Sequence, residues 1–412
     1  MLPRLLNLTR ARELMARDGV DALVAQLPIN VYYLSGYWGF LMGAERFDAA
    51  CFAVLPRVAD RPASLVLPSL ELRRVAGEGG VWMDELHAFS SPLDEDEADE
   101  AGRPYDGWPV RAGVELSPRE RVWVEAVAGH RHRVAASALH ALARAGRSSG
   151  LEGARIVTDD ARVSGWLEAH GLAPASVRYD PSFFNEIRMI KTAPEIELMR
   201  SAALKNERAM LAAVAGLAEG ARWEDIETIY MTEMARQGGR GVYCICGVGG
   251  LPAGEVRRGE PVLFDALGQF RRYHGDFGRS AVLGEPTAEH RRRFRAVQSG
   301  WEAILPMIRP GVRYSELAER ALQTVRRSGF PEFRYVTPHG LGLEHTDDPK
   351  PLGVQLGTKP DQMLEPGMVI NVDMPYTEIG WGSLHLEDTV LVTADGHELL
   401  TTADLDLRCV PG

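Results

Sequence analysis

PVLFDALGQFRRYHGDFGRSAVL, residues 261–283, contains two apolar runs, and each run carries one aspartate. The first run places Asp265 at the end of a strand-like segment, and Asp276 follows 11 residues later. That spacing suits the two arms of a hairpin, on which the two side chains can face each other. A charged group within an apolar strand is costly to bury unless it is paired or bound to a metal. The stretch therefore predicts two antiparallel strands that carry a pair of facing carboxylates.

Three more segments of the C-terminal half place a metal-binding side chain within apolar sequence. Pro338-His339-Gly-Leu-Gly holds an imidazole beside two glycines, where backbone can approach closely. Asp373 ends the strand-like run VINVD, and Glu387 follows the apolar residues of LHLE. Taken singly, each is more often a salt-bridged or hydrogen-bonded core residue. No equal set of Lys or Arg accompanies the five, so a shared metal centre explains them better.

The chemistry of these side chains restricts the metal. Carboxylates with one imidazole suit Mn²⁺, Fe²⁺, Co²⁺ or Zn²⁺ rather than a metal that prefers thiolates. Two such cations about 3.5–4 Å apart activate a water near neutral pH and polarise a carbonyl group. The sequence thus predicts a dinuclear centre that hydrolyses an amide or a related bond. The expected ligands are Asp265, Asp276, His339, Asp373 and Glu387.

Helical patterns surround these strands. Thr192-Ala-Pro-Glu195 is a capping box with proline in the first turn, and apolar residues recur at helical spacing until Gly220 ends the pattern. Further helices are expected near residues 223–238, 287–307 and 315–328, and strands at 261–268, 276–283, 368–374 and 387–394. Helices packed on a largely antiparallel, curved sheet describe an α+β catalytic domain.

The N-terminal part alternates helix-like and strand-like segments, which is typical of an α/β layer. An amphipathic helix opens the chain, and strands are expected at 21–25, 30–37, 51–56, 64–68 and 122–126, with a helix around 133–145. The acidic stretch 91–120 contains several prolines and is predicted to be a long surface loop. A boundary near 175–192 gives two expected domains, 1–175 and 176–412.

Bulk properties exclude several classes of protein. The net charge of −11 argues against a nucleic-acid or anionic-membrane partner, and no apolar run reaches the ~18 residues that span a bilayer. The N-terminus lacks the compact apolar run of a signal peptide. Four cysteines form no disulfide framework, so a reducing compartment, the cytoplasm, is expected. Cys244 and Cys246 are better explained as part of a buried strand than as a soft-metal or redox site.

The chain resembles the M24 peptidases, the creatinase, aminopeptidase P and prolidase group. Residues 184–200, FNEIRMIKTAPEIELMR, look like the entry to their pita-bread catalytic domain, and His339-Gly-Leu-Gly and the order of the five ligands match. Residues 30–36, NVYYLSG, resemble a loop of the creatinase-type N-terminal α/β domain. The resemblance covers essentially the entire chain. It implies an α+β fold with a creatinase-like domain followed by a pita-bread domain.

By this resemblance, Asp276 and Glu387 bridge the two metals, Asp265 completes one site, and His339 with Asp373 completes the other. It also implies a homodimer in which a partner loop borders the pocket. The candidates for that border are Tyr37, Trp38 and Phe40, for which the alternative is a core or interface role.

The sequence departs from the family pattern at the residues that hold the scissile carbonyl. The segment 246–255 contains no histidine, although relatives carry one there. Thr346 occupies the position of a second family histidine, and His345 precedes it. His385 stands where an arginine is frequent, and Asp373 where glutamate is usual. Such donors are typically worth ~10²–10³ in rate, so substitutes are expected. The candidate catalytic residues are His345, Thr346, His385 and Glu387, with Asp347 as a further possible substitute.

The resemblance implies a dinuclear hydrolase of short peptides, of the Xaa-Pro dipeptidase or aminopeptidase type. Its expected partners are a short peptide or small amide and a second copy of the chain. The altered histidines leave open a same-fold enzyme with other chemistry, either a small-molecule amide hydrolase or a lyase. A non-catalytic binding module is the third alternative, and the full ligand set argues against it.

Overall fold

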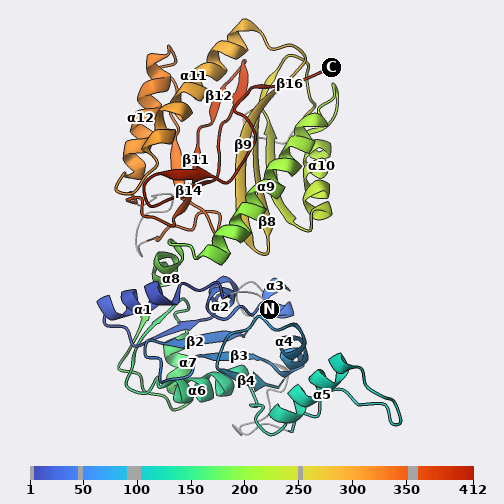
Figure 1. Ribbon diagram of the computed structural model, residues 1–412, viewed down its shortest axis with the longest axis vertical. Helices are drawn as coiled ribbons and strands as arrows, with labels where there is room; N and C mark the ends of the chain where they lie inside the picture. Colours follow the sequence, from blue (N-terminus) through green and yellow to red (C-terminus); the bar gives the residue numbers. More distant parts are fainter. Residues whose placement is uncertain (1–3, 45–49, 91–103, 249–253, 351–360) are drawn as a thin grey trace. The chain divides into compact units, whose positions relative to one another are not determined.

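The computed structural model describes residues 4–44, 50–90, 104–248, 254–350 and 361–412. The chain divides into two compact units, Met1–Ile187 and Arg188–Gly412 (Figure 1). The division places residues 176–187 with the first unit, whereas the sequence boundary at 175/176 assigned them to the second. Within the described residues, no helix has both the length and the apolar character that a membrane span needs.

The first unit is built on a six-stranded mixed sheet with the order β4-β3-β2-β1-β5-β6. The strands are β1 (Ala22–Ala25), β2 (Phe52–Pro56), β3 (Ser64–Pro68), β4 (Glu85–Phe89), β5 (Arg155–Thr158) and β6 (Ser176–Tyr179). The helices are α1 (Leu8–Arg17), α2 (Pro28–Ser35), α3 (Phe40–Ala44), α4 (Leu72–Glu78), α5 (Pro118–His130), α6 (Ala138–Ser149), α7 (Val163–Ala169) and α8 (Pro181–Arg188). The central strand β1 pairs antiparallel with β2 and parallel with β5. The predicted α/β layer is confirmed.

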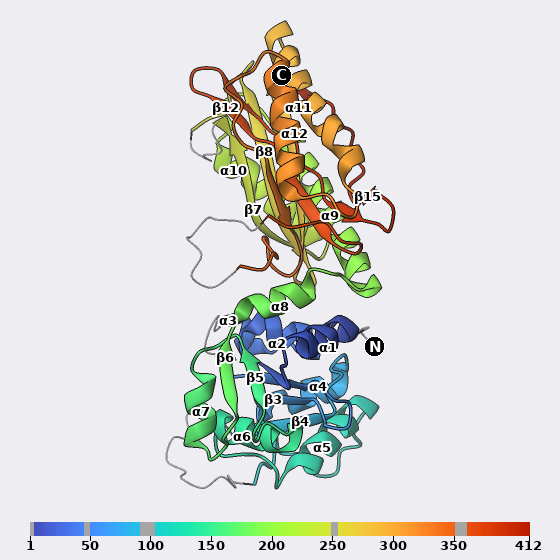
Figure 2. The ribbon, with the colours of Figure 1, turned by 90° about the vertical axis from the view of Figure 1, so that its left-hand side faces the viewer.

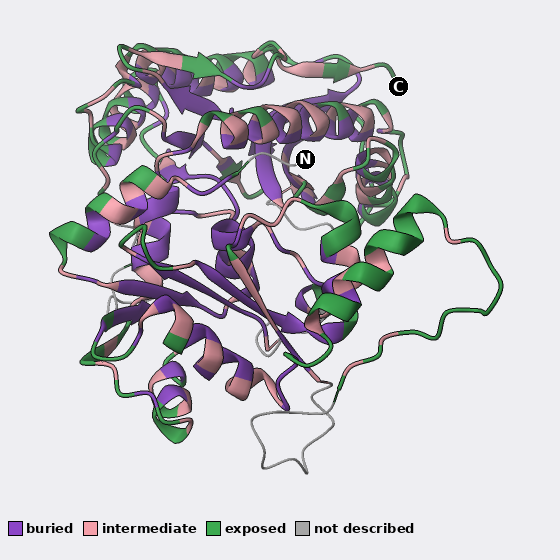
Figure 3. Cartoon of the chain, turned by 60° about the horizontal axis from the view of Figure 1, so that its bottom comes forward, coloured by how far each residue is buried: buried purple, intermediate pink, exposed green. Residues whose placement is uncertain are grey.

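Two strand predictions in this unit are wrong. Residues 30–37 belong mainly to helix α2, which has Pro28 in its first turn and ends at Gly36 in the left-handed conformation, with φ 75°. Its β-forming residues are buried on almost all sides, so core packing overrides their preference. Residues 122–126 lie in α5, which begins at a Ser117 capping box and stays largely exposed (Figure 3). Residues 104–117 form neither helix nor strand, as the loop prediction required, and 91–103 lie outside the described residues.

The aromatic residues near residue 38 differ in their environments. Tyr37 is buried in the core of the first unit, and Trp38 packs edge-on against Tyr32. Phe40 is 68% exposed. Of these three aromatic residues, Phe40 is therefore the one that is largely exposed to solvent.

The second unit contains two helix pairs, each packed on antiparallel strands (Figures 1 and 2). Helices α9 and α10 cover the sheet formed by β7, β8 and β9. The elements are α9 (Ala193–Ala215), α10 (Trp223–Arg236), β7 (Arg240–Gly247), β8 (Pro261–Phe270) and β9 (Tyr273–Leu283). The capping box of Thr192 and Glu195 starts α9 as predicted, and β8 and β9 form the predicted hairpin.

Helices α11 and α12 pack on a second sheet with the order β10-β11-β14-β15. The elements are α11 (Ala288–Ile304), α12 (Tyr314–Arg327), β10 (Thr337–Gly340), β11 (Val369–Asp373), β12 (Tyr376–Glu378), β13 (Gly382–Leu384), β14 (Val390–Val392), β15 (His397–Leu399) and β16 (Arg408–Val410). The last strand, β16, joins β9 in parallel, and the other strand pairs of this unit are antiparallel. The predicted α+β class is confirmed.

Candidate metal centre

The β8–β9 hairpin supplies the first two carboxylates. Asp265 lies opposite Gly278, and Asp276 lies opposite Leu267. Residues 276 and 278 are two apart on one strand and share a face, so the two aspartates project from the same side of the hairpin. The sequence expectation that they face a common space agrees with this register.

The second sheet supplies the other three side chains. His339 lies on β10, and Asp373 ends the neighbouring strand β11. Glu387 precedes β14 and forms an isolated bridge with Gly278, which ties it to the hairpin. The five residues therefore come from five separate segments and meet where the two sheets approach each other.

His339 is the centre of the cluster and is fully buried. Its Nε2 lies 3.4 Å from Asp373 Oδ2, 3.8 Å from Asp276 Oδ2 and 3.8 Å from Glu387 Oε1. Its Nδ1 lies 3.2 Å from the Gly340 carbonyl oxygen, to which it donates. With the proton on Nδ1, the lone pair of Nε2 faces the carboxylates, as in most histidine metal ligands.

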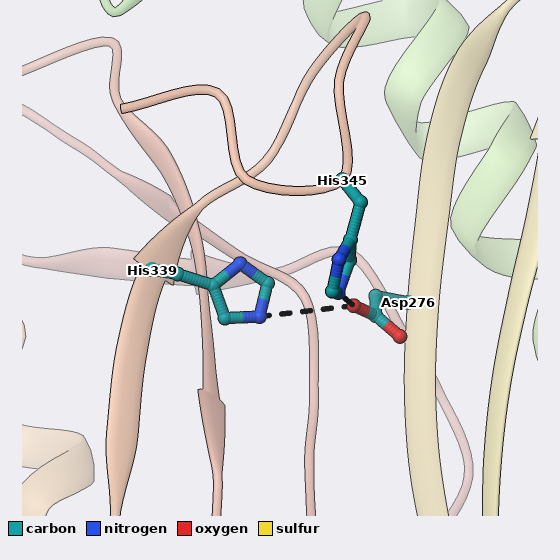
Figure 4. Close-up of side chains that lie close together, drawn as sticks. All are labelled: Asp276, His339 and His345. Atoms are coloured by element: carbon teal, nitrogen blue, oxygen red, sulfur yellow. Dashed lines mark ion pairs between the residues drawn. The ribbon is translucent and has the colours of Figure 1, made fainter. Parts of the chain in front are cut away.

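Possible ligand atoms form two compact groups, and within each group all of them lie within 4.8 Å of one another. Figure 4 shows the first group, in which two imidazoles approach one carboxylate. The members of the first group are Asp276, His339 and His345. The members of the second group are Asp265, Asp373, His385 and Glu387.

Burial and mutual charge shift the pKa values of the carboxylates in this cluster. Burial, and then the charge of Glu387, raises the pKa of Asp265 to about 7 and that of Asp276 well above its usual range. Burial also opposes ionisation of Glu387, but the His339 and His385 imidazoles beside it leave its pKa below the usual range. A cluster of buried carboxylates with raised pKa values is short of positive charge.

Divalent cations fit this deficit. Both carboxylate oxygens of Asp276, Oδ1 of Asp265 and Nε2 of His339 are buried without a hydrogen-bond partner. Throughout the described ranges, the ion pairs of the four carboxylates involve histidines only, and no Lys or Arg neutralises them. Orphaned acceptors that converge on one space are costly unless a cation occupies it.

The structure separates the candidate catalytic residues. His345 Nε2 lies 3.1 Å from Asp276 Oδ2, and the His345 side chain remains 42% exposed. Thr346 is partly buried, and among the described residues no hydrogen bond joins its side chain to the carboxylates. His385 is buried and places Nε2 3.1 Å from Glu387 Oε2. Two histidines thus reach the cluster, and Thr346 does not.

Sequence reasoning missed two members of the site. Asn371 donates from Nδ2 to Glu387 Oε1 at 3.0 Å and to the Asp276 carbonyl oxygen at 3.1 Å. Asn371 stands two residues before Asp373 on the same strand, so the two side chains point to the same face. The sequence could have indicated its role from this spacing. Tyr243 packs edge-on against His345, with ring centroids 6.3 Å apart. Burial and then the charge of Asp265 raise the pKa of Tyr243 far above its usual range.

The strand that carries Tyr243 also carries the C-x-C pair. Cys244 and Cys246 are free and buried in the core beneath α10, which confirms the buried-strand prediction. The segment 246–255, which contains no histidine, is described only in part, because residues 249–253 lie outside the described residues.

Two family models match the chain. Metallopeptidase family M24 matches residues 197–394, and the creatinase/prolidase N-terminal domain matches residues 7–126. The first match contains all five expected ligands as well as His345 and His385.

Curated relatives and solved structures agree with these matches. An Xaa-Pro dipeptidase of Pyrococcus furiosus is 27% identical over 233 residues, which cover 54% of this chain and 66%, just under two thirds, of the relative. A probable dipeptidase PepE of Mycobacterium tuberculosis is 26% identical over 400 residues, 90% of this chain and 100% of the relative. The prolidase structure from Pyrococcus horikoshii OT3 superposes with a TM-score of 0.69 at 19% identity, covering 97% of this chain and 99% of that one. The Xaa-Pro dipeptidase structure from Bacillus anthracis gives 0.71 at 17% identity, covering 98% and 99%. At these identities the structures establish the fold.

Proposed function

Because the chain belongs to metallopeptidase family M24, we propose that it is a dinuclear metal-dependent hydrolase of short peptides, of the Xaa-Pro dipeptidase type. The observation that supports this most is the convergence of four carboxylates and His339 without a neutralising Lys or Arg among the described residues. The relatives described as Xaa-Pro dipeptidases and prolidases supply the substrate class.

The cations would be held by Asp265, Asp276, His339, Asp373 and Glu387, with Asp276 and Glu387 between them. Bound there, two divalent cations of the Mn, Co, Fe or Zn type lower the pKa of water and polarise a carbonyl group. Asn371 holds Glu387 in place through its 3.0 Å hydrogen bond.

The remaining groups handle the substrate. His345 lies at the exposed side of the cluster, where its imidazole can donate to the carbonyl oxygen of a peptide. That position gives it the role of the histidine that relatives carry one residue later. Glu387 is proposed to accept the proton that the attacking water loses and to pass it to the leaving nitrogen.

A second function keeps the same metal centre and changes the substrate. Residue 346 is threonine and has no described contact with the cluster, so the carbonyl-binding groups differ from the family pattern. Such a change favours hydrolysis of a small non-peptide amide, or a lyase reaction, as the alternative.

A dipeptide panel separates the two functions. The protein, loaded in turn with Mn²⁺, Co²⁺ and Zn²⁺, is incubated with Ala-Pro, Met-Pro, Ala-Ala and Met-Ala, and free amino acid is quantified. The proposal requires release of proline from the two Xaa-Pro dipeptides at rates well above those of the others. Metal-loaded protein that cleaves none of the four would overturn it and leave the alternative.

Asp276→Asn provides the matched loss of function, with the exposed Asp395→Asn as its control. Asp276→Asn should abolish turnover and reduce metal content, whereas Asp395→Asn should change neither. Retained turnover in Asp276→Asn would remove the bridging role.

The proposal also covers the cellular compartment and the oligomeric state of the enzyme. Four free cysteines suit a reducing compartment such as the cytoplasm. A homodimer is proposed from the family, with the exposed Phe40 as a candidate contact at the partner's pocket. Light scattering of the purified protein tests the dimer.

A further inference from the structure

His385 occupies a position in the metal centre that its neighbours fix on all sides. Its backbone N–H donates to Ser280 Oγ at 2.7 Å, and the Ser280 hydroxyl donates to the His385 carbonyl oxygen at 2.9 Å. Both residues are buried. One side chain of β9 therefore holds both backbone groups of His385 and fixes the point from which its imidazole projects.

The ring lies directly against the backbone of Gly278. A Cβ at residue 278 would come within 2.1 Å of His385 Cδ2 and 2.4 Å of Nε2, so a larger residue there would force the imidazole to shift. Gly278 is also the residue opposite Asp265 in the hairpin. Glycine at this position therefore makes room for the imidazole beside the strand position of Asp265.

A ring nitrogen of His385 belongs to the same compact group as the oxygens of Asp265, Asp373 and Glu387. Its Nε2 lies 3.1 Å from Glu387 Oε2. First-row cations bind nitrogen and oxygen at about 2.0–2.2 Å, which places adjacent ligand atoms about 3 Å apart. The observed separation is thus the one expected for two neighbouring ligands of one cation.

The imidazole is only half satisfied by the protein. Nε2 faces Glu387, while Nδ1 is buried and has no hydrogen-bond partner among the described atoms. A buried nitrogen without a hydrogen-bond partner costs free energy. Binding of a cation by Nε2, the nitrogen that faces Glu387, would leave the ring proton on Nδ1.

We propose that His385 is a direct ligand of the cation held by Asp265 and Glu387. Each of the two cations then has an imidazole, His339 on one side and His385 on the other. Imidazole suits Zn²⁺, Co²⁺ and Fe²⁺ better than Mn²⁺, which prefers oxygen ligands. The centre should accordingly prefer zinc or cobalt to manganese. The inference rests on the proposed dinuclear function but concerns metal binding, which is measurable without a substrate.

The test compares His385→Gln with the native protein and with His290→Gln, which removes a buried imidazole from the start of α11. X-ray absorption spectra of the zinc-loaded proteins count imidazoles per zinc, and chelator competition gives Zn²⁺ and Mn²⁺ affinities. His385→Gln should lose one imidazole per two zincs, and the affinity of one zinc site should fall by more than ~100-fold. Loss of a group that only orients a ligand costs ~10–100-fold. His290→Gln should match the native protein.

Gly278→Ala is the second variant, because it keeps the imidazole and displaces it. It should reproduce the loss of the imidazole signal and the reduced zinc preference in a protein whose circular dichroism is unchanged. An unchanged imidazole count in both variants would overturn the assignment. Native protein that binds no metal would instead overturn the proposed function. Xaa-Pro dipeptides left intact by protein that shows the predicted ligand change would overturn only the substrate proposal.

Discussion

His345 and Thr346 are adjacent in the chain and differ in their relation to the metal centre. The imidazole reaches Asp276 at 3.1 Å, while no described hydrogen bond links Thr346 to the cluster. The family pattern points to position 346, and the structure points to 345. A shift of one position in this loop thus decides which side chain can contact a substrate carbonyl.

The first prediction concerns this pair. His345→Gln should lower kcat/KM for an Xaa-Pro dipeptide by ~10²–10³, because it removes a donor to the developing negative charge. Thr346→Val should change kcat/KM by less than about threefold, since no hydrogen bond joins its hydroxyl to the site within the described part of the chain. Steady-state kinetics with both variants at saturating metal checks the prediction, and a large effect of Thr346→Val alone would reverse the assignment.

Glu195 carries a pH dependence that is separate from catalysis. It is fully buried at the start of α9, where Thr192 N–H donates to Oε2 and Tyr273 donates to Oε1. Burial raises the pKa of Glu195 from 4.5 to about 7. Because the folded pKa is the higher one, the folded state gains stability when the group is protonated. That stability is fully present below about pH 4.5 and is lost as pH rises to about 7.

Glu195→Gln should remove this dependence, because an amide cannot ionise and can still accept the capping hydrogen bond. A shift of this size corresponds to roughly 3 kcal/mol. The free energy of unfolding, measured in urea at pH 5.5 and pH 8, should differ less in Glu195→Gln than in the native protein. The exposed Glu197→Gln in the same helix is the control and should leave the difference unchanged.

The loop of residues 341–348, which presents His345, is held by a buried ion pair. Arg188 donates to Asp347 Oδ1 from Nε at 2.9 Å and from a terminal nitrogen at 2.7 Å, and Lys191 lies 3.4 Å from Oδ2. Burial would raise the pKa of Asp347, but Arg188 and Lys191 hold it below its usual range. The loop also leaves no room at Gly342, where a Cβ would come within 2.1 Å of Asp347 Oδ2.

Asp347→Asn should destabilise the second unit by about 3 kcal/mol, because it removes the buried counterion that Arg188 and Lys191 share. The variant should also lose activity, since the loop no longer fixes His345. The control is Glu344→Gln, which removes the more exposed partner of the same Arg188 and should cost under about 1 kcal/mol. Chemical unfolding of both variants gives the comparison; equal costs would show that burial of the pair is unimportant.

The proposed metal centre lies between the two halves of the second unit. The carboxylates and His339 come from both sheets, so the two helix-and-sheet halves meet at a cluster of like charge. Cations that bind the folded state alone stabilise it by mass action. The first unit contributes none of these ligands.

Chelation should therefore lower the unfolding temperature of the second unit selectively. At a metal concentration about 1,000-fold above Kd the stabilisation is roughly 4 kcal/mol, which corresponds to a shift of roughly 10 °C for a unit of this size. Differential scanning calorimetry with and without EDTA should show one transition that moves and one that stays. Coincident movement of both, or of neither, would contradict a site confined to the second unit.

The order of residues along the chain already determined the hairpin of residues 261–283 and the start of α9 and predicted the five ligands, because charges within apolar runs and capping boxes are local patterns. It misjudged residues 30–37, because burial rather than local preference sets their backbone, and residues 122–126, which belong to an exposed helix that starts at the Ser117 capping box. Packing alone decided that His345 and not Thr346 reaches Asp276, that Gly278 leaves space for His385, and that Arg188 meets Asp347 from 159 positions away. Such contacts depend on which faces of distant elements come together, and no local pattern encodes that.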